Sequence, residues 1–279
     1  MSYKIIGDSC LDLTETMKKD ARYQMVPLTL QVDDTMVIDD ETFDQKAFIQ
    51  MVKASPNCPK TACPSPEAFK DACHCDADHV YVITLSSHLS GTYNCAVLGK
   101  SLYEEEYGHK DILVIDSWSA SSGELNLAIA IAEWEEAGLS FEEISKKVME
   151  LRDNQKTYFV IDSLEPLRKN GRLTGLQAFF ATALNIKPIM GAEEGVILKY
   201  DQARGINKAF ARMCELAVRD AKTTEDKTVV IAHVNCPDRA EQVKKELEKR
   251  ASFRNIVVTE TAGVATVYAG DGGIILVVG

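Results

Sequence analysis

A run of hydroxyl side chains is the densest group of candidate ligand-binding residues in the chain. It lies within residues 84–96, directly after the apolar run 79–83, and contains Ser86, Ser87, Ser90 and Thr92. The apolar run predicts a buried strand, and the segment from Gly91 onward predicts a helix. Ligands bind open α/β sheets where a strand leads into a helix, and a helix N-terminus attracts anions. The pattern therefore predicts a carboxylate or phosphate site, with serines that merely cap the helix as the alternative.

A second group of hydroxyls lies in the segment Lys60-Thr-Ala-Cys-Pro-Ser-Pro66. Its two prolines stiffen the chain, so that Thr61 and Ser65 are presented at a small entropic cost. A rigid loop with exposed hydroxyls suits ligand binding, although such a loop is often only structural. Cys63 has no neighbouring base in the sequence, which disfavours it as a catalytic nucleophile.

Two further segments combine glycine with polar residues. Asn170-Gly171 is a turn signal, and Gly171 is expected to end a helix with a positive φ. Arg172, just beyond it, is expected either to face solvent or to contact an anion. The segment 261–273 ends in three closely spaced glycines, but it is not a dinucleotide-binding fingerprint, because we expect it to precede a strand rather than lead from a strand into a helix.

Several enzyme and metal signatures are absent from the sequence. It contains neither a Walker A motif nor a G-x-S-x-G elbow, and nothing in the sequence aims His88 at Ser90, which disfavours a serine hydrolase. Its eight cysteines form no C-x-x-C pair. We therefore expect reduced, scattered thiols and no metal site.

The order of strand-like and helix-like segments predicts an α/β protein of two domains. We expect an N-terminal Rossmann-like domain with a parallel sheet over residues 1–162 and a C-terminal α/β domain with a mixed sheet over 163–279. In the first domain the expected strands are 3–7, 24–32, 79–83, 112–115 and 157–161, and the expected loop is 56–66. In the second they are a hairpin of 187–190 with 196–200, then 227–232, 256–259 and 274–278. Three Asp-Ser pairs that follow strands, at Asp8, Asp116 and Asp162, are expected to cap helices.

Composition sets broad limits on function. The chain has 279 residues, 46% of them hydrophobic and 26% charged, as in ordinary globular proteins. Its formal net charge of −11 disfavours nucleic acid as a partner. No signal-peptide pattern or membrane-spanning apolar run occurs, so we expect a cytoplasmic protein.

The motifs, taken in order along nearly the whole chain, resemble those of the DegV family of fatty-acid-binding proteins. The most specific match is Ser86-Ser-His-Leu-Ser-Gly-Thr-Tyr93. Other matches are Asp8-Ser-Cys-Leu-Asp-Leu13, Thr61-Ala-Cys-Pro-Ser65, Leu167-Arg-Lys-Asn-Gly-Arg172 and Ala203-Arg-Gly205.

The resemblance implies a carrier with the EDD fold that holds one long-chain fatty acid between its domains and catalyses nothing itself. Thr61 and Ser90 are the implied main contacts of the carboxylate. The wider set of implied ligand-binding residues is Thr61, Ser65, Ser90, Gly91, Thr92 and Tyr268. The resemblance also implies a partner fatty acid kinase that docks at Arg172 and Arg204. No cofactor is implied, and a transient encounter with a membrane is compatible with the role.

Two positions near the C-terminus depart from the family pattern. Tyr268 lies where many members have a histidine, and Asp271 replaces a proline. A tyrosine hydroxyl can donate a hydrogen bond to a carboxylate but cannot become cationic.

We also expect an apolar helix containing Leu176, Phe179, Phe180 and Leu184 to line part of the acyl tunnel.

The alternative function is an α/β enzyme that acts on a small carboxylated or phosphorylated metabolite.

Overall fold

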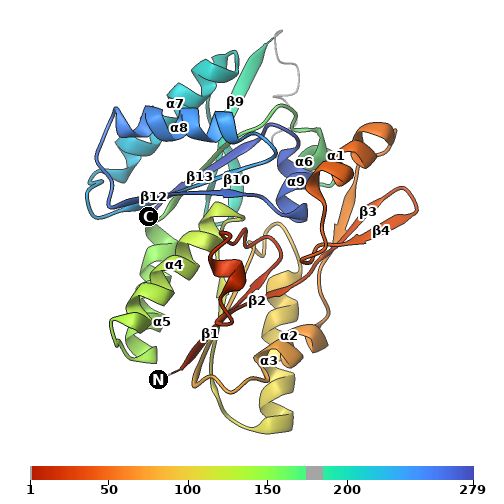
Figure 1. Ribbon diagram of the computed structural model, residues 1–279, viewed down its shortest axis with the longest axis vertical. Coiled ribbons are helices and arrows are strands. Elements are labelled where there is room, and N and C mark those ends of the chain that lie inside the picture. Colours follow the sequence, from red (N-terminus) through yellow and green to blue (C-terminus); the bar gives the residue numbers. More distant parts are fainter. Residues whose placement is uncertain (1, 174–184) are drawn as a thin grey trace.

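The computed structural model describes residues 2–173 and 185–279, which form three sheets with helices around them (Figure 1). A parallel sheet has the order β2-β1-β6-β7 and contains β1 (Tyr3–Asp8), β2 (Tyr23–Val26), β6 (His79–Thr84) and β7 (Asp111–Asp116). A six-stranded mixed sheet has the order β10-β9-β8-β13-β11-β12. Its strands are β8 (Lys156–Val160), β9 (Ile186–Glu193), β10 (Val196–Arg204), β11 (Thr228–His233), β12 (Asn255–Glu260) and β13 (Ile274–Val278). One parallel and one mixed sheet confirm the expected α/β class.

A third, antiparallel sheet has the order β4-β3-β5. Its strands are β3 (Thr29–Val32), β4 (Thr35–Ile38) and β5 (Lys60–Ala62). In Figure 1 the β3–β4 hairpin projects at the right, at the level where the two large sheets meet.

Helices cover both faces of the parallel sheet. On one face α4 (Ser122–Glu136) and α5 (Phe141–Asn154) pack on alternate strand residues such as Ile5 and Ile83. On the other face α2 (Pro66–Cys73) and α3 (Thr92–Tyr107) pack on the intervening residues such as Ile6 and Val82. Because both faces are covered, β6 is buried throughout, as a central parallel strand should be.

The six-stranded sheet is covered in the same way. One face packs against α7 (Ile206–Ala221) and α8 (Pro237–Glu248). The opposite face carries α6 (Glu165–Lys169) and α9 (Gly263–Ala269), with α1 (Gln45–Ala54) beside them. Helix α4 also packs on this opposite face, where the Ser122 hydroxyl donates to the Ile275 carbonyl at 3.0 Å. Helix α4 thereby joins the two large sheets.

The expected strand over residues 24–32 is two strands. Residues Tyr23–Val26 pair with β1 in the parallel sheet, whereas Thr29–Val32 pair with β4 and β5. Pro27 separates them because it has no N–H to donate to a sheet ladder. The Leu28 N–H at the same break donates to the Ser9 hydroxyl instead.

Three other expectations about elements were wrong. The loop expected over 56–66 contains β5, so Thr61 lies in a strand that pairs with Leu30. Strand β8, expected among parallel crossovers, is antiparallel to both β13 and β9. Helix α9 occupies part of the segment that was expected to hold only a glycine-rich turn before the last strand.

The aspartates of the three Asp-Ser pairs do not cap the next helices as expected, whereas the serine of the third pair, Ser163, accepts from the N–H of Glu165 at the start of α6, at 3.2 Å. Asp8 accepts from the Leu85 N–H, and Asp116 accepts from the Ser87 N–H, so each bridges to the loop after β6. Asp162 forms ion pairs with Lys187 and Arg239. Loops at the carboxyl edge of a sheet carry unpaired N–H groups, and carboxylates at neighbouring strand ends are well placed to accept from them.

Some finer expectations are confirmed. Strands β9 and β10 form the expected hairpin, and its turn residues Glu194 and Gly195 both have positive φ, as a primed two-residue turn requires. Gly171 has a φ of 76° after α6. The apolar helix with Leu176, Phe179, Phe180 and Leu184 lies outside the described residues. Within the described ranges, no helix is both long enough and apolar enough to cross a membrane.

Candidate functional site

A cavity lies between the carboxyl edge of the parallel sheet and one face of the six-stranded sheet. The loops after β1, β6 and β7 contribute Cys10, Leu85 and Trp118, and the strands opposite contribute residues such as Phe159 and Ile275. Its empty space, including the open mouth, is about 820 Å³.

Most of the lining is apolar. Its aliphatic and aromatic side chains are Leu28, Leu85, Leu89, Phe159, Ile161, Leu167, Ile197, Val264 and Ile275. Small residues widen the space, among them Ala192, Ala265 and Ala269. A lining of this kind favours a hydrocarbon over a sugar or nucleotide, because it leaves a polar ligand without hydrogen-bond partners.

A compact polar group interrupts this lining. The hydroxyls of Thr61 and Tyr268 are hydrogen-bonded at 2.9 Å, and both residues line the cavity. The Arg172 guanidinium carbon lies 5.7 Å from the centre of the Tyr268 ring, within cation–π range. Arg172 is held there because its Nε donates to the Leu89 carbonyl at 3.0 Å. The cavity therefore combines a largely apolar body with the paired hydroxyls of Thr61 and Tyr268 beside the Arg172 cation. A second hydroxyl pair, Ser119 and Thr157, also lines it, with its oxygens 2.8 Å apart.

Ser90 also lines the cavity, just before α3. Its hydroxyl is 2.9 Å from the Thr92 hydroxyl and accepts from the Thr92 N–H at 3.3 Å. The capping alternative is therefore partly correct, since Ser90 satisfies an N–H of the first turn of α3. The same side chain still faces the cavity, so capping and ligand contact are compatible.

The other expected ligand residues lie around the cavity rather than in its lining. Ser65 caps α2 by accepting from the Ala68 N–H at 3.3 Å. Thr92 is fully buried behind Ser90, and Gly91 is exposed at the start of α3. Of the two expected docking arginines, Arg172 lines the cavity, whereas Arg204 is exposed at the end of β10.

Tyr268 is positioned by α9, a seven-residue helix that is too short to be stable by itself. Its first N–H groups are satisfied by the buried Asp39 carboxylate, which accepts from Gly263 at 2.7 Å and from Val264 at 2.9 Å. Asp12 accepts from the Ala262 N–H. Burial raises the pKa of Asp39 to about 6 and that of Asp12 to about 7.

This capping explains why the sequence analysis missed α9. Helix N-termini are usually recognised from a Ser, Thr, Asp or Asn placed directly before the helix. Here the residue before the helix is Ala262, and the capping carboxylates belong to residues more than 200 positions away. The one usable local signal is the spacing of Val264 and Val267, which both pack into the same buried cluster.

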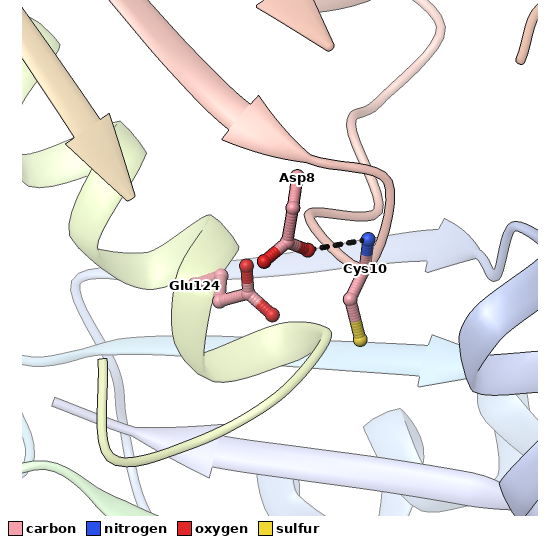
Figure 2. A group of neighbouring side chains, drawn as sticks. All are labelled: Asp8, Cys10 and Glu124. Atoms are coloured by element: carbon pink, nitrogen blue, oxygen red, sulfur yellow. Dashed lines mark hydrogen bonds between the residues drawn. The ribbon is translucent and has the colours of Figure 1, made fainter. Parts of the chain in front are cut away.

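A second buried group lies behind the cavity, where Asp8, Cys10 and Glu124 point toward one another (Figure 2). Asp8 accepts from the Cys10 N–H and the Leu85 N–H, each at 2.8 Å, and therefore fixes the loop that leads to Ser90. Burial raises the pKa of Asp8 to about 7. Burial and the neighbouring carboxylates raise the pKa of Glu124 well above its usual range, which favours its neutral form.

The chain matches the model of an uncharacterised protein family, DegV, over residues 2–278. A DegV domain-containing protein of Streptococcus pyogenes serotype M1 is 33% identical over 280 residues, covering 99% of this chain and 99% of the relative. A family match over almost the entire chain means that the relationship involves both large sheets.

Solved structures of the same fold contain fatty acids. A DegV family protein from Ruminococcus gnavus, described with vaccenic acid, has a TM-score of 0.97 and 47% identity, covering 99% of each chain. The Streptococcus pneumoniae Fatty Acid Kinase (Fak) B3 protein, loaded with linoleic acid, has a TM-score of 0.90 and 29% identity, again covering 99% of each chain. Together with the curated relative and the family match, these similarities show that the chain belongs to the DegV family.

Proposed function

We propose that this protein binds one long-chain fatty acid in the cavity described above and delivers it without chemistry of its own. The observation that carries the proposal is a largely apolar cavity whose lining includes Ser90, Arg172 and the hydrogen-bonded hydroxyls of Thr61 and Tyr268. A hydrocarbon tail fits the aliphatic lining, and a carboxylate fits paired hydroxyls beside a cation. Relatives of known structure carry fatty acids, which supports this choice of ligand.

The tail supplies most of the binding free energy in this proposal. At ~0.8 kcal/mol per buried methylene, a dozen methylenes contribute roughly 10 kcal/mol before the costs of association. The head group then sets orientation and excludes neutral lipids. In the structure, the Thr61 and Tyr268 hydroxyls are hydrogen-bonded to each other. In the proposed complex, the carboxylate accepts a hydrogen bond from each of these two hydroxyls.

Ser90 is the third proposed contact of the carboxylate, because it lines the same cavity. We assign Ser65, Gly91 and Thr92 a role in holding the loops that carry Thr61 and Ser90. Ser65 does so by starting α2, and Thr92 does so through its hydrogen bonds with Ser90. The Tyr268 hydroxyl replaces the histidine common in the family, so this site keeps a donor without an ionisable cation.

The proposed recipient is a fatty acid kinase, as the name of the Streptococcus pneumoniae relative suggests. Arg172 and Arg204 stay the proposed docking residues. Arg204 is exposed, and Arg172 lies at the cavity, where a kinase active site must reach to phosphorylate the carboxylate. We also propose that the protein is cytoplasmic and needs no cofactor. It is proposed to encounter a membrane only transiently.

We also propose a division into two domains that correspond to the two large sheets. The expected boundary at residue 162 follows β8, but β8 pairs only with strands of the six-stranded sheet. Sheet membership therefore supports a boundary a few residues earlier, between α5 and β8. The cavity is then lined by both domains, because Ser90 and Phe159 lie on opposite sides of that boundary.

The mass of the ligand that co-purifies with the protein tests this proposal. Gently purified protein is expected to carry a fatty acid, and delipidated protein is expected to take up palmitate or oleate. Adding ATP and the fatty acid kinase of a related bacterium is then expected to give an acyl phosphate only when this protein is present. Turnover of a small carboxylated or phosphorylated metabolite without a kinase, and without fatty acid uptake, would establish the enzyme alternative instead.

A further inference from the structure

Cys63 and Cys95 place their sulfur atoms 3.8 Å apart beside the proposed head-group site. Cys63 follows β5 and is exposed, whereas Cys95 lies in the first turn of α3 and is half-buried. Among the described cysteines, no other pair of sulfur atoms is recorded in contact. An S–S bond is about 2.05 Å long, so the two sulfurs must approach each other by a further ~1.7 Å to form one.

The two cysteines connect the loops that carry the proposed carboxylate contacts. Thr61 precedes Cys63 by two residues, and Ser90 precedes Cys95 by five. The loops already touch, because a Cβ placed on Gly91 would lie 3.7 Å from the Cys63 sulfur, in ordinary van der Waals contact. A bond between the sulfurs would therefore hold the Thr61 strand against the N-terminus of α3.

We propose that Cys63 and Cys95 form a reversible disulfide under peroxide stress and that this bond slows exchange of the bound fatty acid. Slower exchange of the fatty acid rests on the proposed function, whereas formation of the Cys63–Cys95 disulfide does not depend on it. Fixing the two loops opposes the separation of Thr61 and Ser90 that entry and release of a carboxylate between them require. Reduction by a cellular dithiol restores exchange.

The chemistry begins at the exposed thiol. Cys63 attacks one oxygen of hydrogen peroxide, which breaks the O–O bond and gives a sulfenic acid and one water. The Cys95 thiol then attacks the Cys63 sulfur, expelling a second water and forming the S–S bond. Over the two steps each sulfur is oxidised by one electron, and these two electrons reduce the two peroxide oxygens to the level of water. Burial and the neighbouring Cys63 thiol raise the pKa of Cys95, which fits it to the second step rather than the first.

The experiment treats reduced, delipidated protein with hydrogen peroxide, alkylates the remaining thiols under denaturing conditions and maps the peptides. The expected product is a Cys63–Cys95 cross-linked peptide that dithiothreitol removes. Cys63→Ser and Cys95→Ser each abolish it, and Cys58→Ser, a half-buried cysteine elsewhere, leaves it intact. Irreversible oxidation of Cys63 without a cross-link, or a cross-link to a different cysteine, overturns the assignment.

The second readout is release of a fluorescent fatty acid from the reduced and the oxidised protein. Oxidised wild type is expected to release it several-fold more slowly, whereas Cys63→Ser shows the same rate with and without peroxide. Equal rates in cross-linked and reduced wild type overturn the control of exchange. Reduced protein that binds no fatty acid at all contradicts the proposed function and leaves the cross-link to be judged by the peptide map.

Discussion

The hydroxyl oxygens of Thr61 and Tyr268 lie 2.9 Å apart, although 207 residues separate them in the chain. Thr61 comes from a short strand of the small antiparallel sheet, and Tyr268 comes from α9, which packs on the six-stranded sheet. Their meeting places two hydrogen-bonded hydroxyls in the lining of a largely apolar cavity.

Removing the Tyr268 hydroxyl should weaken fatty acid binding. A hydrogen bond to a charged group contributes ~1.5–3 kcal/mol, so Tyr268→Phe is expected to raise the Kd for palmitate roughly tenfold to a hundredfold. Tyr107→Phe is the matched control, because Tyr107 is exposed at the far end of α3. Displacement of a fluorescent fatty acid measures both. Equal affinities for the two variants would mean that Tyr268 does not contact the carboxylate.

Ser90→Ala should also raise the Kd for palmitate, with little loss of folding stability. The variant removes a proposed carboxylate donor and one acceptor for the Thr92 N–H, the latter being worth ~1 kcal/mol or less. Ser101→Ala, an exposed serine on the same helix, serves as the control. We expect Ser90→Ala to lose affinity in the displacement assay while its thermal unfolding shifts by only a few degrees. An unchanged Kd would remove Ser90 from the site.

Filling the cavity at Ala192 should change the preferred chain length. Strand register places Ala192 beside Thr157 and Ile197, and all three line the cavity. Ala192→Phe occupies space proposed for the acyl tail, and each methylene left unburied costs ~0.8 kcal/mol. Competition between palmitate and laurate, followed by native mass spectrometry, should therefore shift toward laurate. Ala192→Ser, which keeps the volume small, should leave the preference as in the wild type, and an identical shift in both variants would argue against a tail at this position.

Asp39 should affect binding although it does not line the cavity. Asp39→Ala removes both acceptors at the start of α9 and is expected to destabilise the protein by about 1–3 kcal/mol. Because α9 carries Tyr268, affinity for palmitate should fall as well. Asp40→Ala changes the neighbouring half-buried aspartate, whose carboxylate accepts from Thr42 and not from α9, and should leave the affinity for palmitate unchanged. A destabilised Asp39→Ala protein that still binds palmitate with wild-type affinity would show that ligand binding does not depend on how Asp39 holds α9.

The buried carboxyls predict how stability depends on pH. Burial raises the pKa of Asp12 to about 7 in the folded protein, whereas the unfolded chain has the ordinary value near 4. Unfolding therefore releases a proton between these values, so the folded state loses stability as the pH rises from about 4 to about 7. Asp12→Asn keeps an acceptor for the Ala262 N–H but does not titrate.

Urea unfolding at pH 5.5 and pH 8 checks this prediction. Wild type is expected to lose more stability on going to the higher pH than Asp12→Asn does, by up to about 2 kcal/mol for this one group. The same slope in both proteins would show that Asp12 titrates normally in the fold.

Local patterns in the sequence were sufficient for most of the architecture. The strand β6 follows from an unbroken apolar run, and the helix α7 follows from apolar residues that recur with the helical period. Ser90 could be placed at a strand-to-helix junction for the same reason. The break at Pro27 was available from the sequence, since proline cannot continue a central strand, yet the apolar pattern on both sides hid it.

The rest of the site depends on contacts between distant residues. Helix α9 is capped by Asp39 and Asp12, so no local signal marks its start. Arg172 could have faced solvent or an anion, and its bond to the Leu89 carbonyl is what turns it toward the cavity. The Thr61–Tyr268 hydrogen bond likewise exists only because three sheets meet there.

The most direct test of the account is the stoichiometry of palmitate on delipidated protein, measured by native mass spectrometry for the wild type and for Thr61→Val/Tyr268→Phe. The wild type should bind one palmitate per chain, and the double variant should stay largely free at concentrations that saturate the wild type. Absence of any adduct on the wild type, or equal occupancy of the double variant, would contradict a fatty acid site at these two hydroxyls.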